Sequence, residues 1–171
     1  MSEPTLNIYL DIDDVIFKWN KCFTRRYNVN IFKSWVKSDL MDRRITAIEK
    51  EKDFWLNLEI KNIPNFTPKG YVSARSIPKI WTYESLKNHN IPGRSNIHHV
   101  KRGESKIQML RQLNCDIFVD DKVETYMECA KNGIFCLLMD AEHNQEADTE
   151  FRIYDLNYQT IISKYYECIL E

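Results

Sequence analysis

The stretch LNIYLDIDDV, residues 6–15, decides the fold of this chain. Its first part is apolar and rich in residues that favour β-strands, and it runs directly into the carboxylates of Asp11, Asp13 and Asp14. Buried carboxylates are costly unless a cation or another partner neutralises them. In an open α/β sheet, ligands bind at the carboxyl ends of the strands. The stretch therefore predicts a buried strand whose end holds a metal ion.

A second apolar run ends in the same way, because Ile117-Phe118-Val119 leads into Asp120 and Asp121. From residue 70 onward, segments typical of strands and helices alternate, and residues 141–155 are polar and typical of a loop. This order predicts an α/β fold, a Rossmann-like parallel sheet with helices on both faces. We expect further strands at 71–73, 96–100 and 134–139, and helices near 78–90, 104–113, 123–132 and 156–170.

A helical insertion is predicted between the first two strands. Residues 15–27 have the spacing of an amphipathic helix, and residues 30–58 contain no glycine or proline and mix aromatic with charged side chains. The proline- and glycine-containing segment 63–70 marks the return to the sheet. We therefore expect a small helical cap inserted after the first strand. The predicted boundaries are 1–17 and 66–171 for the α/β core and 18–65 for the cap.

Composition limits the classes of function. A chain of 171 residues, 43% of them hydrophobic, can bury one core and carry a modest insertion. The 24 Lys and Arg residues balance 25 Asp and Glu residues, so nothing indicates a polyanionic partner, whereas a small charged substrate is compatible. The five cysteines are widely spaced and form no CxxC motif, which argues against a disulfide framework and a zinc site.

The first residues lack a basic segment followed by an apolar core, and no run approaches the roughly 20 apolar residues of a membrane span. We expect a soluble, cytoplasmic protein that does not enter the membrane, either a monomer or a homodimer.

Four segments in this order resemble the motifs of the haloacid dehalogenase superfamily of phosphohydrolases, over about residues 8–140. Each segment alone is a weak signal, and their order carries the information. Within the superfamily the chain is most similar to the 5'(3')-deoxyribonucleotidase group, with Phe54-Trp55-Leu56-Asn57-Leu58 and Trp81 as supporting details. The four motifs are Asp11-Ile12-Asp13-Asp14-Val15, Val72-Ser73-Ala74-Arg75, Lys106 and Val119-Asp120-Asp121.

The resemblance implies a phosphomonoesterase that depends on Mg²⁺. Asp11 would attack phosphorus to form an aspartyl-phosphate, and Asp13 would act first as general acid and then as general base. The metal ligands would be Asp11, the main-chain carbonyl of Asp13, and Asp121, with Asp120 as the close alternative to Asp121.

The phosphate group would be held by other residues of the second and third motifs. By resemblance, the Ser73 hydroxyl and the Ala74 backbone N–H would bond phosphate oxygens, and Lys106 would balance the charge of the phosphate and the nucleophile. Lys101 is an alternative to Lys106. Arg75 departs from the pattern of the deoxyribonucleotidases, and we expect it either to pair with Asp120 or to line the pocket.

The cap carries the substrate hypothesis. Phe17, Trp19, Phe54 and Trp55 offer flat apolar faces on which a nucleobase could stack, and the alternative is that they form the cap's own small core. We therefore expect a small phosphorylated substrate, a nucleoside or deoxynucleoside monophosphate. A sugar phosphate or a nucleic-acid 3'-phosphate end is the rival substrate, although a polynucleotide usually needs a basic groove. A non-catalytic phosphate-binding or signalling module is the rival of another class, and the order of the motifs argues against a receiver domain.

Overall fold

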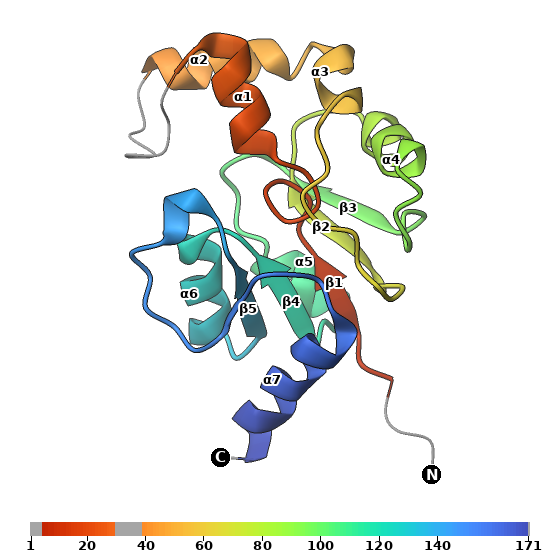
Figure 1. Cartoon of the computed structure of the whole chain (residues 1–171), viewed down its shortest axis with the longest axis vertical. Helices are drawn as coiled ribbons and strands as arrows, with labels where there is room; N and C mark the ends of the chain where they lie inside the picture. Colours follow the sequence, from red (N-terminus) through yellow and green to blue (C-terminus); the bar gives the residue numbers. More distant parts are fainter. Residues whose placement is uncertain (1–4, 30–38, 171) are drawn as a thin grey trace.

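The structure is a computed structural model that describes residues 5–29 and 39–170. Its centre is a six-stranded sheet in the order β3-β2-β1-β4-β5-β6, and every neighbouring pair is parallel (Figure 1). The predicted parallel α/β sheet is confirmed. The strands are β1 (Ile8–Leu10), β2 (Gly70–Ala74), β3 (Ile97–Val100), β4 (Ile117–Asp120), β5 (Phe135–Met139) and β6 (Arg152–Ile153).

Helices cover both faces of the sheet, as predicted. Side chains alternate along β1, so that Ile8 and Leu10 enter one core while Tyr9 enters another. The helices α4 (Lys79–Asn88) and α7 (Tyr158–Leu170) contribute to the first core. The helices α5 (Ile107–Gln112) and α6 (Val123–Lys131) contribute to the second. Because both faces of β1 are buried, its short sequence is apolar throughout until the chain leaves the sheet.

The strand order reverses at the centre of the sheet. The chain moves outward from β1 to β2 and β3, and then returns to the other side of β1 with β4. Such a switch point leaves a crevice beyond the carboxyl ends of the two central strands, which is where open α/β sheets bind ligands. Asp11 directly follows β1, and Asp120 is the last residue of β4. The topology therefore brings the two acidic segments to one place.

Three helices follow β1 and lie together beyond this edge of the sheet (Figure 1). They are α1 (Trp19–Tyr27), α2 (Asp39–Ile48) and α3 (Lys52–Leu56), and all three fall within the predicted cap, residues 18–65. The part of the predicted helical segment at residues 30–38 lies outside the described residues.

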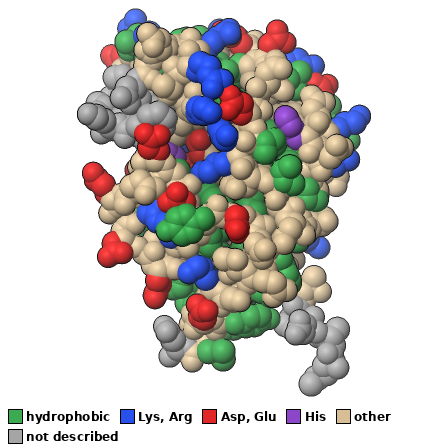
Figure 2. Space-filling view, viewed as in Figure 1, with side chains coloured by type: hydrophobic (Ala, Val, Ile, Leu, Met, Phe, Trp, Pro, Cys, Tyr) green, Lys and Arg blue, Asp and Glu red, His purple; other side chains and the backbone are tan. Residues whose placement is uncertain are grey.

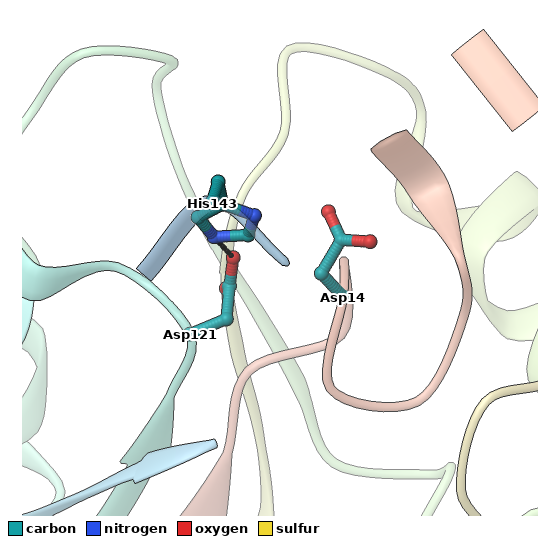
Figure 3. A group of neighbouring side chains, drawn as sticks. All are labelled: Asp14, Asp121 and His143. Atoms are coloured by element: carbon teal, nitrogen blue, oxygen red, sulfur yellow. Dashed lines mark ion pairs between the residues drawn. The ribbon is translucent and has the colours of Figure 1, made fainter. Parts of the chain in front are cut away.

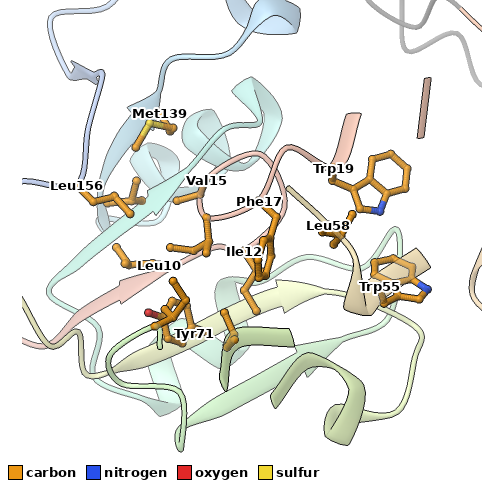
Figure 4. Close-up of a cluster of buried hydrophobic side chains, with 14 of the residues drawn as sticks. Leu10, Ile12, Val15, Phe17, Trp19, Trp55, Leu58, Tyr71, Met139 and Leu156 are labelled. Carbon is orange, nitrogen blue, oxygen red and sulfur yellow. The ribbon is translucent and has the colours of Figure 1, made fainter. Parts of the chain in front are cut away.

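The cap and the sheet share one apolar cluster. Leu10 of β1 and Phe17 belong to the same cluster of buried side chains as Trp19, Trp55 and Leu58 (Figure 4). The Trp19 ring also stacks on Phe23, with 4.8 Å between ring centroids. Burial of apolar surface stabilises roughly in proportion to its area, so this continuous cluster holds the cap over the edge of the sheet.

Two predictions of local structure were wrong. The helix expected from Val15 begins only at Trp19, because the chain first makes a tight loop in which the N–H groups of Val15, Ile16 and Phe17 all approach the Ile12 carbonyl, at 2.8–3.3 Å. The polar segment 141–155 is not only a loop, since it contains the 3₁₀ helix η1 (Glu142–Asn144) and strand β6. A two-residue edge strand is too short to show a sequence period.

None of the helices in the described part of the chain has the length and apolar character needed to cross a bilayer.

Candidate active site

Asp11 is held at the end of β1 by the main chain around it. Its N–H donates to the Val119 carbonyl of β4 at 2.9 Å, which continues the ladder between the two strands by one residue. The N–H of Ile12 donates to Asp11 Oδ1 at 2.7 Å. The side chain is only 3% exposed, so the carboxylate is fixed in direction and almost removed from water.

Lys106, the residue just before α5, joins the two acidic segments. Its Nζ lies 2.9 Å from Asp11 Oδ2 and 2.6 Å from Asp120 Oδ2, and all three residues are buried. Lys101, the alternative, is exposed. A lysine at the entrance to a helix beside the strand ends can reach back over them, and here it donates to both carboxylates at once.

Burial controls the charges of this group. It raises the pKa of Asp11 to about 7, because the nearby charge of Lys106 offsets only part of the desolvation and Asp120 adds repulsion. Burial also raises the pKa of Asp120, against the opposing charge of Lys106. For Lys106 itself burial acts to lower the pKa, but the two carboxylates outweigh burial and the pKa is raised. Lys106 therefore stays charged, while the carboxylates need more positive charge than it supplies.

The two aspartates of the fourth motif have different partners. Both carboxylate oxygens of Asp120 have a partner, because Oδ2 accepts from Lys106 and Oδ1 accepts from the backbone N–H of Lys122 at 2.8 Å. Asp121 Oδ2 lies 2.7 Å from His143 Nε2, whereas Asp121 Oδ1 is buried and has no hydrogen-bond partner among the residues that the structure describes. An unsatisfied buried carboxylate oxygen is costly and marks a place for a missing ligand.

Asp13 is paired with Arg75 rather than left to solvent. The guanidinium holds both carboxylate oxygens, with Nη2 at 2.6 Å from Oδ1 and Nε at 3.0 Å from Oδ2. Arg75 also donates to Thr82 Oγ1 at 3.0 Å and lies over the Trp55 ring, 4.9 Å from its centroid. Its side chain is fully buried, while that of Asp13 is 22% exposed. Of the two expectations for Arg75, pairing with Asp120 is wrong, and its partner is Asp13.

Ser73 and Ala74 close β2 beside β1, at the same edge of the sheet. Ser73 is only 1% exposed and lies opposite His99 of β3 in the strand register. The parallel pairing of β2 with β1 thus brings the second motif next to the first.

The four candidate aromatic residues divide between core and cap. Phe17 is fully buried in the tight loop and forms isolated bridges with Asp13 and Ile60, so the expectation that it stacks on a base is wrong. Trp19 is a core residue as well. Trp55 is buried with its Nε1 donating to the Ile48 carbonyl at 2.8 Å, while Phe54 is only partly buried. Phe54 is thus the member of the four that keeps the most accessible surface.

Asp14, the third carboxylate of the first motif, lies close to Asp121 and His143. Its φ of 57° is in the left-handed region, which few residues other than glycine adopt readily. The side chain accepts the Asn20 N–H at 3.2 Å, and the Asp14 carbonyl accepts from Lys61 Nζ at 2.7 Å. Burial and the repulsion of Asp121 raise the pKa of Asp14. Figure 3 shows Asp14, Asp121 and His143, which come from three separate segments of the chain.

Sequence reasoning missed Lys61, His143 and Asn20. Lys61 Nζ also donates to the Asp140 carbonyl at 2.6 Å, so it ties the loop after β1 to the end of β5. None of these residues belongs to a run with a readable period, and their partners lie 6 to 123 positions away. No local pattern marks them.

Comparison with known proteins gives a family. No protein-family model matches the chain. The chain is 35% identical over 172 residues to a nucleotidase of Clostridium acetobutylicum, an alignment that covers 82% of this chain and 83% of that protein. The chain belongs to this nucleotidase family. A solved structure, the Unknown transcript 4 protein of Saccharomyces cerevisiae, overlaps 86% of this chain and 96% of its own, with a TM-score of 0.44 and 12% identity.

In this member of the nucleotidase family, charged side chains at the site form three groups of ion pairs. Asp11, Lys106 and Asp120 form the first, and Asp13 with Arg75 forms the second. The third is Asp121 with His143. One oxygen from each of Asp11, Asp120 and Asp121 lies within 4.8 Å of the others, which is a spacing that one cation can bridge. A cation at this place would bind Asp121 Oδ1, which no described residue contacts by a hydrogen bond, and would favour the charged form of Asp11, whose pKa burial raises.

Proposed function

We propose that the chain is a Mg²⁺-dependent phosphomonoesterase of the haloacid dehalogenase type that acts on nucleoside monophosphates. The observation that carries the proposal is the buried cluster at the ends of β1 and β4, in which no described residue donates a hydrogen bond to Asp121 Oδ1. Mg²⁺ prefers oxygen ligands and retains several waters, so one or two carboxylates and a carbonyl suffice. Asp11, Asp121 and the Asp13 carbonyl would hold the ion, which supplies positive charge for the phosphate and the carboxylates.

In the first half of the reaction, a carboxylate oxygen of Asp11 attacks phosphorus and the bond from phosphorus to the ester oxygen breaks. The departing alkoxide takes a proton from Asp13, and the alcohol leaves. Arg75 orients Asp13 for this role, because its two bonds fix the plane of the carboxyl group while each oxygen keeps a second lone pair. Partial exposure of Asp13 lets the leaving group reach it.

In the second half, water attacks the phosphorus of the aspartyl-phosphate and Asp13 takes the proton from that water. The bond from phosphorus to Asp11 breaks, inorganic phosphate leaves, and the carboxylate is restored. Lys106 acts in both halves by opposing the negative charge that builds near Asp11, at a distance of 2.9 Å. Fixed charge of this kind acts strongly in a site removed from water.

Two features support a nucleoside monophosphate as the substrate. The clostridial relative is named a nucleotidase, and Phe54 of the cap keeps an accessible face for a base.

A column of basic side chains runs down one face of the molecule (Figure 2). On α1, however, Lys21 and Arg25 pair with Glu59, and Arg26 pairs with Glu51. Basic side chains that are already paired do not make an open groove for a polynucleotide.

The test is release of inorganic phosphate from dTMP, dUMP, a 3'-phosphorylated oligonucleotide and a sugar phosphate, each with Mg²⁺ and with EDTA. We expect turnover of the two nucleotides that EDTA abolishes. Asp11→Asn should lower kcat by at least about 1,000-fold, because an amide cannot act as the nucleophile. Asp148→Asn, which changes an exposed aspartate far along the chain, is the matched control and should retain activity.

Circular dichroism should show the same fold for both variants. Activity on the sugar phosphate alone would contradict the proposal that the substrate is a nucleoside monophosphate. Full activity of Asp11→Asn would contradict the proposal that Asp11 is the nucleophile.

A further inference from the structure

His143 contacts the side chain of Asp121 from a segment that the reaction described above does not use. Its Nε2 lies 2.7 Å from Asp121 Oδ2, and the side chains of the two residues are 7% and 3% exposed (Figure 3). A carboxylate has acceptors only, so the ring proton at this contact belongs to Nε2. A buried ion-pair contact of this length restrains both the imidazole and the carboxylate.

The other ring nitrogen is held by the cap. His143 Nδ1 lies 2.9 Å from Asn20 Nδ2, and Asn20 is a buried residue in the first turn of α1. A ring with a partner at each nitrogen cannot rotate or flip without losing a bond. The contact thus runs from the cap helix through the imidazole to the end of β4.

The segment that carries His143 also forms a hydrogen bond with the main chain of Asp121. Asn144 Nδ2 donates to the Asp121 carbonyl at 2.8 Å and to the Met139 carbonyl at 2.8 Å, and Asn144 Oδ1 accepts the Ala141 N–H at 3.1 Å. Asn144 is itself 2% exposed. Side chain and carbonyl of Asp121 are therefore both fixed by the same turn, η1.

As a result, the two carboxylate oxygens of Asp121 have different surroundings. Oδ2 contacts His143, and Oδ1 is buried without a hydrogen-bond partner in the described part of the chain. Groups that hydrogen-bond a metal-binding side chain orient it, and losing one typically weakens metal affinity about 10- to 100-fold. Asp121 has this arrangement, with His143 at one oxygen and its carboxylate in the same cluster as those of Asp11 and Asp120.

We propose that His143 is a positioning residue that orients Asp121 for the metal ion and couples this ligand, through Asn20, to the cap. The inference rests on the proposed Mg²⁺ dependence. It adds a residue that reaches the ion only through Asp121, so its loss should change metal affinity more than the chemical step.

The experiment measures Mg²⁺ binding by isothermal titration calorimetry, without substrate, in parallel with the Mg²⁺ dependence of kcat. His143→Ala should raise the Kd for Mg²⁺ about 10- to 100-fold, while kcat at saturating Mg²⁺ changes by less than about threefold. His143→Gln keeps an N–H donor that can reach Asp121 and should recover most of the affinity. Asn20→Ala removes the bond to Nδ1 without touching Asp121 and should raise the Kd about fivefold.

His98→Ala is the matched control, because His98 lies in β3 with the Asn96 side chain as its hydrogen-bond partner, and it should bind Mg²⁺ like the parent chain. Unchanged Mg²⁺ affinity in both His143→Ala and Asn20→Ala, with the parent chain binding Mg²⁺, would overturn the positioning role and leave the proposed function intact. A parent chain that neither binds Mg²⁺ nor depends on it would overturn the proposed function itself. If His143→Ala does not fold, Asn20→Ala and His143→Gln decide the outcome by the same measurement.

Discussion

Lys106 is the residue on which the charge balance of the site depends. It is buried between two carboxylates, at 2.9 Å from Asp11 and 2.6 Å from Asp120. Removing one partner of a buried ion pair leaves the other charges uncompensated, which is strongly destabilising. In the proposed reaction the same ammonium opposes the charge that develops at phosphorus. One substitution should therefore affect both stability and rate.

Lys106→Met should lower kcat by on the order of 100- to 1,000-fold and reduce the free energy of unfolding by about 3 kcal/mol. Steady-state kinetics and urea unfolding measure the two effects. Lys101→Met removes a nearby exposed lysine and is the control, since loss of a solvated charge costs little. A larger loss of activity in Lys101→Met than in Lys106→Met would contradict the assignment.

Arg75 and His143 show what the sequence hides at the scale of single residues. The strand-end rule predicts that Asp11, Lys106 and the pair Asp120 and Asp121 meet, and the structure brings them together. Which side chain then pairs with which depends on rotamers and on neighbours far along the chain. Arg75 reaches Asp13 across 62 positions, a contact that no periodic pattern encodes.

Elements were predictable in proportion to how strongly burial constrains their sequence. Strands β1 and β4 are buried on both faces and show as apolar runs, so their positions could be predicted. The start of α1 could not be predicted, because Val15 and Phe17 are buried in a tight loop and their apolar side chains do not belong to a helix. Strand β6 could not be predicted either, because only one of its two residues is buried and it forms no apolar run.

Arg102 adds polar contacts between the core and the cap helix α2. Arg102, in the loop between β3 and Lys106, donates to Glu49 at 2.8 Å, to Asp42 at 3.2 Å and to Thr46 at 3.2 Å. These contacts are partly exposed, so together they are worth about 1 kcal/mol. They join the segment that leads to Lys106 to a cap element.

Arg102→Ala should increase amide hydrogen exchange in α2 about fivefold, because losing about 1 kcal/mol raises the population of the locally open state by that factor. Hydrogen-exchange mass spectrometry of peptides from 39–48 measures it. Lys101→Ala, the adjacent exposed cation, is the matched control and should leave α2 unchanged. Equal exchange in both variants would mean that Arg102 does not hold the cap.

Over the whole molecule, net charge is nearly balanced, at −1, but it is unevenly distributed. Five carboxylates gather at the carboxyl edge of the sheet, where Arg75 pairs with Asp13 and Lys106 pairs with Asp11 and Asp120. The carboxylates are Asp11, Asp13, Asp14, Asp120 and Asp121. Burial and mutual repulsion raise the pKa of Asp11 and Asp14 in this group, and the proposed divalent cation would relieve that cost.

A ligand that binds only the folded state stabilises it by mass action, by about 2.7 kcal/mol at 100 times its Kd. For a chain of this size, Mg²⁺ at that concentration should raise the Tm by about 5 to 10 °C, and EDTA should reverse the rise. Differential scanning calorimetry measures it at constant ionic strength, because screening by salt also weakens the repulsion. Asp121→Asn removes a carboxylate ligand and should abolish the Mg²⁺-dependent rise, whereas Asp148→Asn should keep it. The same rise in Asp121→Asn would show that the cation acts elsewhere, since the stabilisation would then not depend on the oxygen that the fold leaves without a partner.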